Sequence, residues 1–136
     1  VFLDADLVGL RPEHVDRLVA AVASGQADMA CGMFDRGPVV NRLLRASLPV
    51  LTGQRALRRD LFDWLDEDDV RGWRVEAALN SLVAQRGLVR RVEVLPGLWH
   101  RTKEEKLATP ALGHASKLAM LASACWGYVR FSLRPV

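Results

Sequence analysis

The sequence predicts an α/β fold in which strands and helices alternate around a parallel or mixed sheet. Apolar runs that predict strands occupy residues 1–4, 27–34 and 88–97, and segments of helical periodicity lie between them. A strand followed by a crossover helix and a second strand is the βαβ unit, the building block of such sheets. The chain has 136 residues, which is enough for one domain with its own core or for part of a larger domain.

The first predicted unit begins with VFLD, residues 1–4, which we expect to be a buried strand because the run is continuous and apolar. After a glycine, Pro12 is expected in the first turn of a helix, and Gly25 should end that helix. Its apolar face comprises Val15, Leu18, Val19 and Val22. The chain returns as a second strand over ADMACGMF, residues 27–34, and this completes a βαβ unit.

The middle of the chain alternates helical segments with polar turns. A helix-prone segment is interrupted by Pro49 and contains Leu43, Leu44 and Leu48. Residues 52–54, Thr-Gly-Gln, suit a helix interior poorly, so we expect a tight loop there and a new helix after it. The acidic run 66–69 predicts a loop, and solvation alone would explain its charges.

The last part of the chain predicts a helix, a strand pair and a final helix. The periodicity from Arg74 to Arg86 is helical, and Gly87 should end that helix. Its apolar stripe comprises Val75, Ala78, Leu79, Leu82 and Val83. LVRRVEVLPG predicts a strand, LWHRT a second strand after the Pro-Gly turn, and residues 110–133 a long helix.

Composition and charge exclude several classes of protein. Two isolated cysteines, Cys31 and Cys125, have no metal-binding spacing, so reduced buried thiols and a cytoplasmic location are expected. The uncharged run 118–129 is too short to span a bilayer. The front of the chain is acidic and the rear is basic, but no aromatic residues are interleaved with the basic ones, which argues against nucleic acid as a partner.

Two carboxylates, Asp4 and Asp6, follow the first predicted strand at a D-x-D spacing. Carboxylates that converge at a strand tip can hold a divalent cation, since hard cations prefer oxygen ligands. An isolated D-x-D is also compatible with a solvated turn capped by an aspartate side chain. The pair alone leaves both interpretations open.

Four blocks of sequence, in order, resemble the second half of nucleotide-sugar glycosyltransferases of the GT-A fold. The blocks are VFLDADLVGLRPEHVDRLV, LTGQRALRRDLF, GWRVEAALN and VLPGLWHRTKEEK. The resemblance is to bacterial family 2 enzymes and the related glucosyl-3-phosphoglycerate synthases, and it covers most of residues 1–106. It implies a partial three-layer GT-A sheet with a C-terminal helix, and residues 1–136 as a single partial domain.

The resemblance also implies a metal and a donor site. Asp6 would be a direct metal ligand and His100 a further one, while Asp4 would contact the ribose or a metal-bound water. Mg²⁺ or Mn²⁺ is the expected cofactor, and an imidazole ligand tilts the choice toward Mn²⁺. Arg101, Lys103 and Lys106 would hold the leaving diphosphate, although a solvated basic loop explains them equally well.

For the acceptor, the resemblance implies a binding loop of Gly53, Gln54 and Arg55. The alternative is a plain tight turn followed by a salt-bridged arginine. Glu76 matches the family's acidic residue and would act as general base or accept a sugar hydroxyl. An ordinary acidic residue in the first turn of a helix would look the same, and the run 66–69 could supply a base instead. Trp73 and Arg74 depart from the family pattern, which leaves the acceptor undefined.

The function that follows is metal-dependent transfer of a sugar from a nucleotide sugar to an acceptor hydroxyl, with an upstream nucleotide-binding half expected. The acceptor would be a small phosphorylated or lipid-linked molecule. One alternative is a non-catalytic fragment or scaffold domain. Another is a haloacid-dehalogenase-like phosphatase, although Leu7-Val8-Gly9 replaces the threonine pattern of that class. Trp126 and Tyr128 beside Arg130 suggest contact with the inner face of a membrane, and packing on the sheet or in a homo-oligomer is the alternative.

Overall fold

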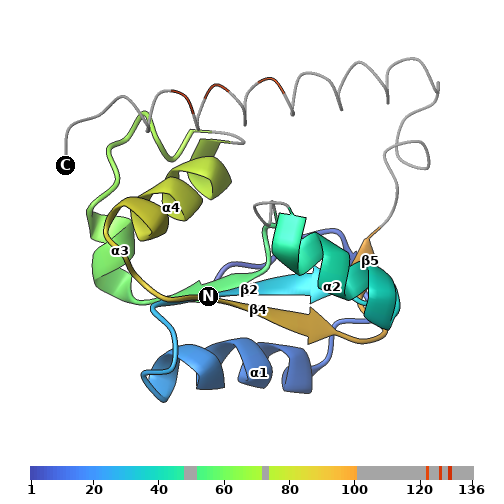
Figure 1. Cartoon of the computed structure of the whole chain (residues 1–136). Helices are drawn as coiled ribbons and strands as arrows, with labels where there is room; N and C mark the ends of the chain where they lie inside the picture. The colour runs from blue at the N-terminus through green and yellow to red at the C-terminus, as the bar shows by residue number, and fades with distance from the viewer. Residues whose placement is uncertain (48–51, 72–73, 101–121, 123–125, 127–128, 130–136) are drawn as a thin grey trace.

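The computed structural model describes residues 1–47, 52–71, 74–100, 122, 126 and 129. Three strands, in the order β3-β2-β4, form one sheet, and β1 and β5 form a separate two-stranded ribbon (Figure 1). The elements in chain order are β1 (Leu7–Val8), α1 (Pro12–Ala23), β2 (Met29–Phe34), α2 (Pro38–Ser47), β3 (Arg55–Leu57), α3 (Arg59–Asp63), α4 (Arg74–Gln85), β4 (Arg90–Leu95) and β5 (Trp99–His100). The predicted α/β fold with a mixed sheet is confirmed.

The sheet is mixed because β2 has neighbours of both directions. It pairs in parallel with β4 over its whole length, from Met29 opposite Arg90 to Phe34 opposite Leu95. It pairs antiparallel with β3, where Cys31 lies opposite Arg55. Next to β3, Phe2 forms an antiparallel bridge with Arg55, so the N-terminal segment continues the sheet beyond β3.

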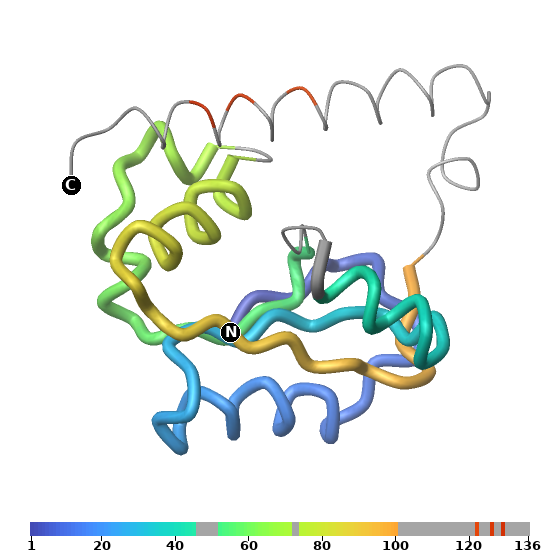
Figure 2. Tube along the Cα trace, in the orientation of Figure 1, coloured from blue at the N-terminus to red at the C-terminus, as the bar shows by residue number. Residues whose placement is uncertain are grey.

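Each face of the sheet carries its own apolar core, because successive side chains of a strand point to opposite faces. In β2, Met29 and Cys31 face α3 and α4, and the core there includes Leu61, Ala78, Leu79, Leu82 and Val83. Ala30 faces α1, and that core includes Leu18, Ala21, Ala56, Leu95 and Leu98. Figure 2 shows the resulting layers, with α1 on one side of the β2–β4 pair and α4 on the other.

Helix α1 forms where the sequence predicts it. Pro12 is its first residue, and Gly25 follows the helix with a φ of 72°, a left-handed conformation that favours glycine. Leu18 is fully buried, whereas Val19 from the predicted apolar face is 38% exposed. The buried His14 ties the start of the helix to the Pro96 carbonyl, which lies 3.0 Å from Nε2.

The N-terminal apolar run differs from its prediction as a buried strand. Val1, Phe2 and Leu3 are 59%, 42% and 37% exposed, and the run makes one bridge rather than a regular strand. The run lies at the edge of the sheet and has β3 as its one neighbouring strand in the described part of the chain. Its side chains are therefore less buried than those of a central strand. The first regular strand is β1, which begins after Asp6.

The region after α2 also departs from the prediction in one respect. Residues 52–54 form the expected loop, but the short strand β3 follows the loop before helix α3 begins. Helix α2 ends at Ser47, close to the predicted break, and Pro49 lies outside the described residues. Helix α4, strand β4 and strand β5 form as predicted, and Gly87 follows α4 with a φ of 62°.

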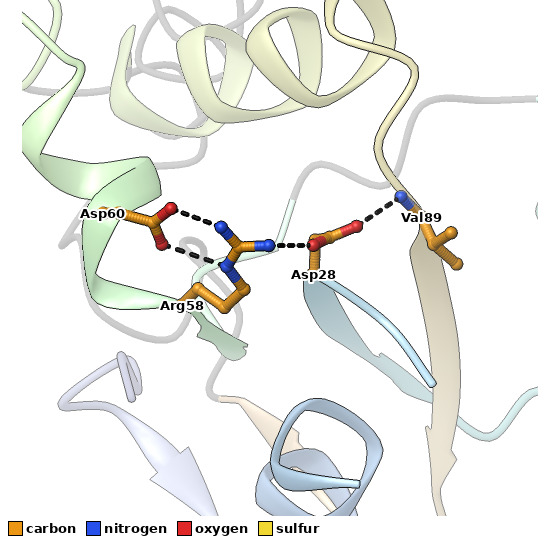
Figure 3. Close-up of polar contacts among 4 residues, drawn as sticks. All are labelled: Asp28, Arg58, Asp60 and Val89. Carbon is orange, nitrogen blue, oxygen red and sulfur yellow. Dashed lines mark hydrogen bonds and ion pairs between the residues drawn. The ribbon is translucent and has the colours of Figure 1, made fainter. Parts of the chain in front are cut away.

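A polar network joins the starts of β2, β4 and α3 at one end of the sheet (Figure 3). Arg58 donates to Asp28 at 2.7 Å and binds both oxygens of Asp60. The second oxygen of Asp28 accepts the backbone N–H of Val89 at 2.9 Å. Asp28 therefore links an arginine before α3 to the backbone just before β4.

The predicted helix at 110–133 lies largely outside the described residues. Ala122, Trp126 and Val129 are helical. The side chains of Trp126 and Val129 are 59% and 50% exposed. Within the described ranges, no helix is long and apolar enough to cross a membrane.

Candidate functional site

A pocket of about 340 Å³ lies beside α4, and several of the residues singled out from the sequence line it. Its polar residues come from three separate segments: the first D-x-D aspartate, the loop before β3, and the first turn of α4. Its lining residues are Phe2, Leu3, Asp4, Gly53, Arg55, Phe62, Val70, Val75, Glu76 and Leu79.

The D-x-D segment and the loop before β3 are in direct contact. The side-chain amide of Gln54 donates to Asp4 Oδ2 at 2.5 Å, and Gln54 itself is 1% exposed. The Asp4 carboxylate also lies against Gly53, where an added Cβ would be 1.9 Å from Oδ1. Only a residue without a side chain leaves room for this carboxylate, which is the local reason for glycine at position 53.

Arg55 is a buried cation beside the same loop, with an exposed fraction of 2%. Its Nε and Nη2 atoms both donate to the Thr52 carbonyl, at 3.0 and 2.5 Å, and Nη1 lies 3.9 Å from the Met29 sulfur. Among the described residues it forms no ion pair with a carboxylate, so the alternative of a salt-bridged arginine does not apply there. Its charge is directed toward the pocket region that also holds Asp4 and Glu76.

Glu76 lies in the first turn of α4 and lines the pocket. Burial raises the pKa of its carboxyl, the nearby guanidinium of Arg55 opposes this, and the charge of Asp4 adds to the increase. The carboxyl therefore holds its proton more tightly than an exposed glutamate does. Such a group is better suited to accept a proton from a hydroxyl than an ordinary surface carboxylate is.

Cys31 lies in the adjacent core and is not part of the chemistry. Burial raises the pKa of its thiol, against the lowering influence of Arg55 and Arg90. The thiol therefore stays protonated and unreactive at neutral pH. The prediction of a reduced, buried cysteine at this position is confirmed by its exposure of 0%.

Sequence reasoning missed the apolar wall of the pocket. The rings of Phe2 and Phe62 stack at a centroid distance of 5.4 Å, and Val70 lines the pocket with them. No sequence signal links the two phenylalanines, because they are far apart in the chain and meet only when the N-terminal segment pairs with β3. By contrast, Val75 and Leu79 belong to the apolar stripe predicted for α4.

The acidic run 66–69 does not line this pocket. Asp69, the last residue of the run, is 3% exposed, and its carboxylate accepts the backbone N–H of Asp66 at 3.2 Å. Solvation alone therefore does not explain the run, since one of its members stabilises the turn itself. Of the two candidates for a general base, Glu76 and the run 66–69, Glu76 is the one that lines the pocket.

The second D-x-D aspartate, Asp6, directly precedes β1, and His100 is the last residue of β5. Leu7, the residue after Asp6, pairs with His100, so two segments far apart in the chain lie side by side. Gly9 and Gly97 allow this approach: an added Cβ on Gly9 would be 2.3 Å from the Gly97 carbonyl oxygen. The imidazole of His100 contacts the Phe34 ring edge-on at 5.1 Å and is exposed to solvent.

The metal ligands expected from the sequence, Asp6 and His100, stay a prediction. Within the described residues, no group of three or more His, Cys, Asp or Glu side chains is arranged to hold a metal ion. The carboxylate of Asp4 is instead bound by Gln54. The predicted cations Arg101, Lys103 and Lys106 lie outside the described residues.

Comparison with known proteins places the fold. The structure is similar to the crystal structure of glucosyl-3-phosphoglycerate synthase from Mycobacterium tuberculosis, which was solved in complex with Mn²⁺, uridine-diphosphate-glucose and phosphoglyceric acid. The TM-score is 0.69 at 23% sequence identity, and the match covers 99% of this chain and 49% of that one. No protein-family model and no curated protein sequence matches the chain. The chain therefore has a glycosyltransferase-like GT-A fold and spans about half the length of the enzyme it resembles.

Proposed function

We propose that this chain is the metal- and acceptor-binding half of an enzyme that transfers a sugar from a nucleotide sugar to an acceptor hydroxyl. One observation carries the proposal: Asp4, the loop 53–55 and Glu76 meet at one pocket although they come from three distant segments. These are residues that the family resemblance singles out, and the fold of the chain is that of a glycosyltransferase.

Glu76 is the proposed general base. It would take the proton of the acceptor hydroxyl as that oxygen attacks the anomeric carbon of the sugar. Burial and the charge of Asp4 raise the pKa of its carboxyl, which brings proton affinity closer to the working pH. Arg55 opposes this increase and favours the ionised carboxylate, which is the form that a base needs.

Gly53, Gln54 and Arg55 are the proposed acceptor loop. The buried guanidinium of Arg55 has a backbone carbonyl as its main partner, so an acceptor carrying a phosphate or carboxylate would provide the missing counter-charge. This favours a small phosphorylated acceptor. A lipid-linked acceptor would present the same phosphate group to Arg55. Phosphoglyceric acid, bound by the structural neighbour, is an acceptor-sized molecule of that kind.

Asp6 and His100 are the proposed ligands of Mn²⁺ or Mg²⁺, and Asp4 the proposed contact to the ribose or to a metal-bound water. The cation, when bound, neutralises the diphosphate and favours its departure. Arg101 and Lys103 would then hold the departing diphosphate. The structural neighbour was solved with Mn²⁺, in agreement with a divalent metal in this fold.

The proposal includes a second half that binds the nucleotide base, since the match covers 49% of the similar enzyme. Residues 1–136 would then form one partial domain. We further propose a cytoplasmic location, which suits the buried free thiol of Cys31. Contact of the 110–133 segment with the inner face of a membrane or with a second copy remains part of the proposal, and vesicle flotation with and without residues 114–136 tests it.

The proposed function is tested by measuring transfer of labelled glucose from UDP-glucose to 3-phosphoglycerate with Mn²⁺, on a protein that carries both halves. Glu76→Gln should reduce kcat by at least ~100-fold with little change in the binding of UDP-glucose, as removal of a general base does. Arg59→Ala, on the exposed surface of α3, serves as the control. Hydrolysis of a phosphomonoester, blocked by Asp4→Asn, would instead support a phosphatase.

A further inference from the structure

A second pocket of about 470 Å³ lies between α2 and the end of β4, and the proposed function does not use it. Its lining residues are Pro38, Asn41, Arg42, Arg45 and Val94. It shares no lining residue with the pocket at Glu76, and β2 separates β4 from β3 in the sheet. The two pockets are therefore distinct sites.

The second pocket is basic. Arg42 and Arg45 are one turn apart on α2, and neither forms a hydrogen bond or an ion pair with another described residue. Arg17 approaches from α1 and donates to the carbonyl oxygen of Val94 at 3.2 Å. Two guanidinium groups thus line the pocket, and no carboxylate is among the described residues that line it.

The nearby acidic groups are engaged elsewhere. Asp35 accepts the backbone N–H of Gly37 at 2.9 Å and the amide of Asn41 at 2.8 Å, so its charge is held at the start of α2. Glu93 pairs with Arg91 at 2.6 Å. Neither carboxylate neutralises Arg42 or Arg45, and these like charges at an i,i+3 spacing repel each other until an anion binds.

We propose that the α2–β4 pocket binds a phosphate or diphosphate group, with Arg42 and Arg45 as its main ligands. The planar guanidinium matches a phosphate in a bidentate manner, and the volume is that of a small-molecule site. On the outer side of the same helix, Val39, Val40 and Leu43 are 76%, 42% and 64% exposed. A phosphate carried by a soluble molecule and one carried by a lipid headgroup share this chemistry, and the second would also meet the exposed aliphatic side chains.

The site is tested by titrating the ¹⁵N-labelled 136-residue chain with inorganic pyrophosphate and following the backbone amides. The amides of Asn41, Arg42, Arg45 and Val94 should shift, and the dissociation constant should increase at least tenfold in Arg42→Ala/Arg45→Ala. The matched control is Arg59→Ala/Arg71→Ala, which removes the same charge from exposed positions and should change affinity less than twofold. Equal loss in the two double variants, or shifts confined to residues 53–55, would overturn the proposal.

The source of the phosphate is identified by two further probes on the same variants. If glycerol phosphate binds with the same dependence on Arg42 and Arg45, the ligand is a soluble phosphate ester. If binding requires vesicles of phosphatidylcholine with phosphatidic acid, and is also weakened by Val39→Ser/Leu43→Ser, the ligand is a lipid headgroup. Failure of both probes together with pyrophosphate would overturn the site. Because Glu76 and Arg55 are unchanged in these variants, this result is independent of the proposed transferase activity.

Discussion

Asp4 and Gln54, fifty positions apart in the sequence, form a hydrogen bond of 2.5 Å between the carboxylate of one and the side-chain amide of the other. Gln54 also binds the hydroxyl of Thr52, and it is 1% exposed. The amide therefore fixes the orientation of the Asp4 carboxylate from the side of the loop before β3. Because the D-x-D segment and this loop are joined through the bond, a substitution in one should change the geometry of the other.

Gly53→Ala should destabilise the protein. The added Cβ would be 1.9 Å from Asp4 Oδ1 and 2.5 Å from its Cγ, so the carboxylate or the loop has to move. Overpacking of this kind typically costs ~1–3 kcal/mol, and urea denaturation measures it. The matched test repeats Gly53→Ala in an Asp4→Ala background, where the cost should largely disappear. An equal cost in both backgrounds would mean that the strain lies in the loop backbone.

The predictions that held depend on local signals. Helix α1 is bounded by Pro12 and Gly25, and α4 is marked by its apolar period and by Gly87; each acts within a few residues of the element it defines. The prediction that VFLD is a buried strand was wrong, because the burial of an apolar strand depends on which elements pack beside it in the sheet. Strand β3 was missed, since three residues carry too little pattern and their pairing with β2 is non-local.

The sequence singles out several residues of the candidate pocket but not their geometry. Asp4, Gly53 and Glu76, which the family resemblance implies, line one pocket, and Gln54 is bound to Asp4 beside it. Their roles in a reaction stay predictions. The contact between Gly53 and Asp4 could not be read from the sequence, because it depends on how the N-terminal segment packs against the loop before β3. The stacking of Phe2 on Phe62 arises from the same non-local packing.

Glu76 should make the stability of the protein depend on pH. The folded-state pKa of its carboxyl is raised above the ordinary value of a glutamate, chiefly by burial. The folded state therefore binds this proton more tightly than the unfolded state, and the stabilisation, present in full below about pH 4, is lost as pH rises through the folded pKa. Urea denaturation from pH 4 to 8 should show wild type losing stability relative to Glu76→Gln over that range. A constant difference between the two proteins would contradict the raised pKa.

Arg55 should influence Glu76 directly. Its guanidinium lowers the pKa of the Glu76 carboxyl, in opposition to burial and to Asp4. Arg55→Gln should therefore raise that pKa further, which NMR titration of the side-chain ¹³C carboxyl resonance measures. Asp4→Asn should lower the pKa of the Glu76 carboxyl, because the charge of Asp4 raises it. Equal titration curves in all three proteins would show that the charges do not interact.

Asp28→Ala should destabilise the protein more than Asp60→Ala. Asp28 is 18% exposed at its side chain and binds both Arg58 and the backbone N–H of Val89, so its loss frees one donor before α3 and one before β4 (Figure 3). Loss of such bonds typically costs ~1 kcal/mol, which urea denaturation resolves. Asp60→Ala removes only an exposed ion pair with Arg58. It is the matched control and should change the free energy of unfolding little. If Asp60→Ala costs as much, the link through Val89 contributes nothing.

Mn²⁺ should bind at the β1–β5 ribbon if Asp6 and His100 are its ligands. The pairing of Leu7 with His100 brings the residue after Asp6 next to His100, and a paramagnetic ion there should broaden the amide resonances of residues 5–8, 99 and 100 first. Asp6→Asn and His100→Ala should each raise the Mn²⁺ concentration needed for that broadening, because each removes one ligand. Asp16→Asn, an exposed aspartate on α1, is the matched control and should leave the concentration unchanged. Broadening that begins in the acidic turn at 66–69, and is unaffected by Asp6→Asn, would place the cation away from the ribbon.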